Sequence, residues 1–127
     1  MTLIQDGVAI SDAALATGLS THTLRYYERA GLMLDPVERA SSTHRRYSEA
    51  DIAWVLFLTR LRSTGMPIAT MREYTDLVRR GDETIAARHE LLVRHRTSVA
   101  RQLEETTASL AAIDIKIAIY EEKAVNA

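Results

Sequence analysis

The side chains best suited to bind another molecule lie in the segment 18–32, which carries hydroxyl, imidazole and guanidinium groups at close spacing. If this segment is a helix, Thr21, His22, Arg25 and Tyr26 fall on one outer face, with Arg29 one turn further on. Hydroxyl groups and arginine are suited to phosphates and base edges in a DNA groove. The segment therefore predicts the recognition helix of a protein that binds double-stranded DNA.

Each of these positions also has a second interpretation. Tyr26 and Tyr27 are adjacent, and one of two adjacent helical residues usually packs in the core, so Tyr26 faces either DNA or the interior. Arg25 and Arg29 could instead form a solvated face beside Glu28. His22 could be a plain exposed residue of the first turn. The residue types alone leave these alternatives open.

A second cationic group, Arg45 and Arg46, precedes Tyr47 at the return of a β-hairpin that we predict over residues 32–47. A hairpin of this kind, a wing, places arginine against the DNA backbone or in the minor groove, where the negative potential favours it. The alternative is a solvated pair of loop charges. Tyr47 either contacts DNA or, because it precedes the helix cap Ser48, packs as a hydrophobic staple on the following helix.

Composition excludes several other classes of function. The chain of 127 residues contains no cysteine and four scattered histidines, so we expect no disulfide, metal site or cofactor. No nucleophile–base–acid set and no glycine-rich phosphate loop is present, which predicts that the protein is not an enzyme. The formal net charge is −1, so DNA binding would depend on local cations. No apolar run is long enough to span a bilayer and no signal peptide is evident, so we expect no membrane partner and a cytoplasmic location.

The elements that would position these groups are mainly α-helical. Helices are predicted over 11–17, capped by Ser11, and over 20–30, capped by Ser20, and only Gly18 and Leu19 separate them. A capping box at Ser48 begins a helix over 49–63, and a further helix runs from Pro67 to Arg80. Residues 1–81 thus form a predicted winged helix-turn-helix domain.

Residues 82–127 are predicted to form one long dimerisation helix. The stretch contains neither glycine nor proline, and from Val99 onward its apolar residues follow a heptad. A helix of about 40 residues is roughly 60 Å long and needs a partner, for which a second copy is the simplest choice. The expected dimer-interface residues of this coiled coil are Leu92, Val99, Leu103, Leu110, Ile113, Ile117 and Tyr120.

The sequence strongly resembles the MerR family of bacterial transcription regulators. The resemblance rests on the stretches 24–32 (LRYYERAGL), 46–52 (RYSEADI) and 65–68 (GMPI), and residues 74–88 are similar to the aldehyde- and electrophile-responsive subgroup. It implies an antiparallel coiled-coil homodimer that binds a palindrome in a promoter and distorts a spacer that is too long for RNA polymerase. By motif position, Thr23, Arg25 and Tyr26 would contact DNA from the recognition helix, Arg45 and Arg46 from the wing, and Arg62 would bind phosphate.

The residues with which this family senses its signals have no match in this chain. The subgroup uses a cysteine in the helix after the wing, and the matching position here is Arg60, so alkylation of a thiol is excluded as the signal. For a small-molecule effector, the candidate pocket lining is Trp54 and Tyr74, and the alternative is that both are plain core residues. The alternative function is a protein-interaction adaptor that does not bind DNA, which near-neutral charge would suit.

Overall fold

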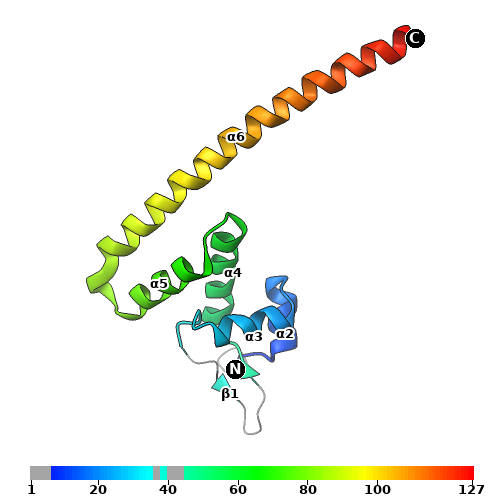
Figure 1. Ribbon diagram of the computed structural model, residues 1–127. Helices are drawn as coiled ribbons and strands as arrows, with labels where there is room; N and C mark the ends of the chain where they lie inside the picture. Colours follow the sequence, from blue (N-terminus) through cyan, green and yellow to red (C-terminus); the bar gives the residue numbers. More distant parts are fainter. Residues whose placement is uncertain (1–6, 36–37, 40–44) are drawn as a thin grey trace. The chain divides into compact units, whose positions relative to one another are not determined.

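A computed structural model describes residues 7–35, 38–39 and 45–127 (Figure 1). The described chain divides into a first unit that ends at Leu91 and a second unit that begins at Leu92. In chain order the elements are α2 (Ile10–Thr17), α3 (Thr21–Arg29), β1 (Glu38–Arg39), β2 (Arg45–Arg46), α4 (Glu49–Ser63), α5 (Ile68–Arg79), the 3₁₀ turn η1 (Asp82–Thr84) and α6 (Ile85–Asn126). The predicted mainly α-helical class with a long C-terminal helix is confirmed.

Local hydrogen bonds explain where most of the helices begin. The Ser20 hydroxyl accepts the N–H of Thr23 at 3.0 Å and caps α3, as predicted. Ser48 and Asp51 form the predicted reciprocal capping box at the start of α4. The prediction that Ser11 caps the first helix is wrong: α2 begins at Ile10 after an extended Ala9, because the Ala9 carbonyl already accepts the N–H of Ala13.

The core of the first unit lies where α2 packs against α3 and α4, and where α4 packs against α5. Leu24 and Tyr27 of α3 are buried in it, as their helical spacing predicts. The largest side chains that are fully buried in the described residues are Tyr47, Leu24, Leu32, Leu58, Met66, Met71 and Val55. Burial of such side chains, each contributing about 1.5–3 kcal/mol, fixes the inner face of α3 and leaves its outer face to solvent.

A glycine closes the C-terminal end of α3. Gly31 has a φ of 76° and its N–H bonds to the Glu28 carbonyl, while the N–H of Leu32 bonds to the Tyr27 carbonyl at 3.0 Å. These two bonds form a Schellman motif, which needs a left-handed residue that glycine adopts without strain. The chain therefore turns sharply out of α3 into the segment 30–34.

Two short antiparallel strands follow that segment. Glu38 pairs with Arg46 and Arg39 with Arg45. Residues 36–37 and 40–44, which belong to the predicted hairpin, lie outside the described residues, as does the Arg45 side chain. Val8 and Tyr47 exchange two backbone hydrogen bonds of 2.8 Å, which fastens the N-terminal segment to the end of the strand pair just before α4.

The second unit consists of the remainder of α6, a single helix of 42 residues that begins in the first unit. Every side chain of this unit from residue 100 onward is exposed, including the large apolar ones. Among the described residues, no helix combines the length and the apolar character that crossing a membrane requires.

Candidate nucleic-acid interface

The outer face of α3 presents the predicted recognition residues to solvent. His22, Arg25 and Arg29 are exposed, and the Tyr26 ring is 40% exposed. Thr21 and Thr23 are half-buried, and the Thr23 hydroxyl accepts a hydrogen bond from Ser20 at 3.0 Å. The helix therefore offers imidazole, guanidinium and phenol groups on a surface whose backbone is fixed by buried Leu24 and Tyr27.

Tyr47 is buried in the core of the first unit. Its side chain is 1% exposed, and its hydroxyl donates to the Glu28 carboxylate on α3 at 2.5 Å. The prediction that Tyr47 contacts DNA is therefore wrong, because a ring enclosed in this way has no surface to offer a ligand. Its hydrogen bond instead ties the segment just before α4 to α3.

Replacing Tyr47 by phenylalanine should keep the packing and remove the hydrogen bond to Glu28. We expect the free energy of unfolding to fall by about 1.5–3 kcal/mol, the usual contribution of a bond to a charged group. Denaturant unfolding at a fixed protein concentration measures the change. A decrease of less than about 0.5 kcal/mol would show that the Glu28 bond contributes little.

The other predicted basic residues differ in their exposure. Arg62 on α4 is exposed, and its guanidinium lies 3.5 Å from the Met66 carbonyl. Arg46 is half-buried, and the side chain of Arg45 lies outside the described residues. That Arg25, Arg45, Arg46 and Arg62 share one cationic surface stays a prediction.

Three aromatic rings meet between α4 and α5. Trp54 and Tyr74 are stacked with ring centroids 5.8 Å apart, and Phe57 lies against Tyr74 at 5.9 Å. Burial raises the pKa of the Tyr74 hydroxyl above its usual value, and the nearby positive charge of Arg88 opposes this shift in part. Trp54 and Tyr74 thus cover each other's faces, and their role in an effector pocket stays a prediction.

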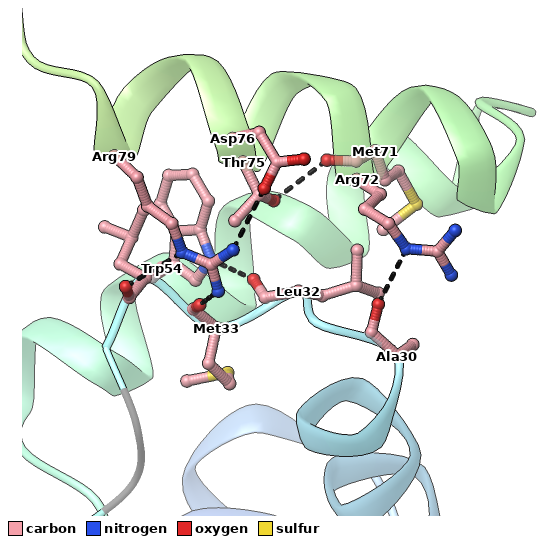
Figure 2. Close-up of polar contacts among 10 residues, drawn as sticks. Ala30, Leu32, Met33, Trp54, Met71, Arg72, Thr75, Asp76 and Arg79 are labelled. Carbon is pink, nitrogen blue, oxygen red and sulfur yellow. Dashed lines mark hydrogen bonds and ion pairs between the residues drawn. The ribbon is translucent and has the colours of Figure 1, made fainter.

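Sequence reasoning missed two arginines of α5 that reach the segment following α3 (Figure 2). Arg72 donates from Nε to the Ala30 carbonyl at 2.8 Å. Arg79 donates from Nε to the Leu34 carbonyl at 3.0 Å and from Nη2 to the Met33 carbonyl. Trp54 adds a bond of 2.7 Å from its indole N–H to the Leu32 carbonyl. Side chains of α4 and α5 thus hold the backbone of the segment 30–34 along most of its length.

The helix-turn-helix and the helices that follow it match known protein families. Residues 8–77 match the model of the MerR HTH family regulatory proteins, and residues 52–114 match the model described as MerR, DNA binding. The chain belongs to the MerR family. Its helix-turn-helix, α2 and α3, therefore lies within the DNA-binding region of a transcription regulator.

Individual MerR relatives extend the likeness over most of the chain. The HTH-type transcriptional regulator AdhR of Bacillus subtilis is 44% identical over 87 residues, which cover 68% of this chain and 61% of AdhR. An uncharacterised HTH-type transcriptional regulator of Haemophilus influenzae is 32% identical over 121 residues, covering 90% of this chain and 89% of that protein. The match to AdhR thus spans about three fifths of that regulator's length.

A solved MerR structure also superimposes on this one. HiNmlR, described as a MerR family regulator lacking the sensor domain and bound to promoter DNA, aligns with a TM-score of 0.82 and 31% sequence identity. The alignment covers 90% of each chain. The curated relatives carry the names of transcription regulators and not of enzymes.

Proposed function

We propose that this MerR-family protein acts as a homodimer that binds a two-fold symmetric promoter site, with α3 of each copy in the major groove. The observation that carries the proposal is the exposed outer face of α3 with His22, Arg25 and Tyr26. The promoter DNA in the complex of the relative HiNmlR supports it. In this assignment Thr21 and Thr23 contribute hydroxyls near the phosphates at the start of the helix.

The apolar stripe of α6 supports the homodimer. Leu103 is 66% exposed and Leu110 56% exposed, and Ile113, Ile117 and Tyr120 are exposed on the same seam. Leu92 and Val99, at its beginning, are half-buried. Each large apolar side chain gains about 1.5–3 kcal/mol when it is fully buried, which an antiparallel coiled coil with a second copy would provide.

The remaining parts have roles that follow from this assembly. The strand pair β1–β2 serves as the wing, with Arg45 and Arg46 against the DNA backbone, and Arg62 binds a phosphate. The dimer distorts the promoter spacer so that RNA polymerase can engage both of its elements, and sequence is then read partly through the cost of that distortion. A small-molecule effector bound beside Trp54 and Tyr74 would alter this distortion, and the protein would act in the cytoplasm.

Selection of DNA by the purified chain tests the proposal. Random duplexes that the full chain retains at moderate salt should converge on an inverted repeat, because two related copies of α3 read related half-sites. Footprinting on a selected site should show hypersensitive cleavage between the half-sites if the spacer is distorted. Recovery of unrelated duplexes, or of none, would reject DNA regulation and would favour a protein-interaction adaptor.

A further inference from the structure

The segment 30–34 connects α3 to the strand pair, and side chains of two other helices hold it through its backbone. The Arg79 guanidinium is engaged at all three nitrogens: Nε and Nη2 donate to the carbonyls of Leu34 and Met33, and Nη1 donates to the Asp76 carboxylate at 3.0 Å. Figure 2 shows Arg72 and Arg79 projecting from the same helix, α5, toward this segment. Asp76 lies on α5 as well and orients the Arg79 guanidinium.

These bonds address a specific weakness of the fold. The last carbonyls of a helix have no partner within the helix, and the two Schellman bonds at the end of α3 satisfy only those of Tyr27 and Glu28. Arg72 satisfies the carbonyl of Ala30, which is the C-cap residue of α3. A cation at the C-terminal end of a helix also interacts favourably with the helix dipole. The end of α3 and the entry to the strands are thus fixed from α5.

We propose that Arg79, assisted by Arg72, is a positioning residue for DNA recognition. It holds α3 and the strand pair at the mutual angle that lets both reach one duplex, and it does not itself bind a phosphate. The proposal rests on the proposed function, because it concerns the same DNA-binding surface. Its physical basis is that Nε and Nη2 of Arg79, the two donors that bind a phosphate side-on, already donate to the Leu34 and Met33 carbonyls, so a bidentate contact through that edge would displace these bonds.

The same geometry makes α5 the element through which the DNA-binding surface can be adjusted. Any displacement of α5 along its axis would move the Arg79 and Arg72 donors together, and with them the carbonyls of Ala30 and Leu34. Hydrogen bonds to charged donors are short and directional, so the segment follows the donors rather than stretching the bonds. The fit of α3 and the strand pair to one half-site would therefore depend on α5 residues that do not touch DNA.

The test compares Arg79→Gln and Arg72→Gln with Arg80→Gln. Arg80 lies next to Arg79 at the end of α5, and its guanidinium faces Glu83 at 3.7 Å, so this control removes the same charge without touching the segment. Asp76→Asn keeps Arg79 and removes only its orienting carboxylate. All measurements are made below the melting transition of each variant, on a palindromic duplex selected by the wild-type protein and on a scrambled duplex.

We expect hydrogen exchange in peptides covering residues 31–35 of the free protein to be faster in Arg79→Gln than in the Arg80→Gln control. Affinity for the palindrome should fall about tenfold, which corresponds to one charge-assisted hydrogen bond, while affinity for the scrambled duplex stays within twofold. The slope of log affinity against log salt should equal that of the control. Asp76→Asn should cause the same changes in hydrogen exchange and in affinity for the palindrome, but smaller ones. Arg72→Gln should cause these changes as well.

Other results would overturn the positioning role. If Arg79 bound a phosphate in each copy, Arg79→Gln would reduce the salt slope by about 0.9 per phosphate, and Arg79→Lys would restore it. Unchanged exchange at 31–35, or unchanged affinity for the palindrome, would contradict the proposal directly. If the wild-type chain and Arg80→Gln select no palindrome, the proposed function fails, and the exchange experiment still decides whether Arg79 orders the segment.

Discussion

Changing Leu103 and Leu110 together to aspartate should convert the protein to a monomer and lower its apparent affinity for a palindromic site about 100-fold or more. Both side chains are largely exposed on the seam of α6, and the dimer would have to bury four carboxylates at that position. Linking two DNA-binding units raises overall affinity by about 10² to 10⁴ through effective concentration alone. Monomers lack this gain even though each α3 is unchanged.

Sedimentation velocity and gel-shift titration measure the two effects. Ala108→Asp with Ala112→Asp is the matched control, because it adds the same charge to the same helix on the face opposite the seam. This control should remain a dimer and bind with nearly wild-type affinity. A dimer that persists in the seam variant would show that the heptad assignment is wrong.

Replacing Arg25 by alanine should weaken binding to the selected palindrome by about 1–3 kcal/mol per half-site, or roughly 5- to 150-fold. The Arg25 side chain is exposed on the outer face of α3, and a bidentate interaction with a base or phosphate is worth this much. Tyr26→Ala should also weaken binding, since the ring is accessible. The dimer and the melting temperature should be preserved, because neither side chain is part of the core.

Arg101→Ala is a suitable control for this pair. Arg101 is exposed on α6, so its replacement removes one positive charge from a part of the chain that the proposal keeps away from DNA. An equal decrease of affinity in Arg25→Ala and Arg101→Ala would indicate nonspecific charge attraction only. Competition with scrambled DNA separates the two cases, because only a recognition contact changes preference among sequences.

The parts of the fold that were predictable from sequence are those set by neighbours in the chain. Ser20 caps α3 and Ser48 pairs with Asp51 because a cap requires only a side-chain oxygen three residues before an N–H. The burial of Leu24 and Tyr27 follows from helical periodicity. The match of residues 8–77 to the MerR family model shows that the motif at 24–32 was specific.

The parts that escaped prediction depend on contacts between distant residues. The partner of Tyr47 is Glu28, 19 residues earlier, and no local pattern indicates that bond. Arg79 bonds to carbonyls 45 and 46 residues away, and backbone carbonyls are identical at every position. The only signal for this contact in the sequence was the cluster of arginines at the end of α5, together with Asp76, which forms an ion pair with Arg79.

The heptad stripe of α6 would also set the spacing between the two copies of α3 in the proposed dimer. In the proposed antiparallel dimer, sliding the two copies by one heptad would change their separation by about 10 Å along the coil. One turn of B-DNA is about 34–36 Å for 10–10.5 base pairs, so such a slip equals roughly three base pairs. In that assembly, operator length would follow from the register in which Leu103 and Leu110 pair with their counterparts.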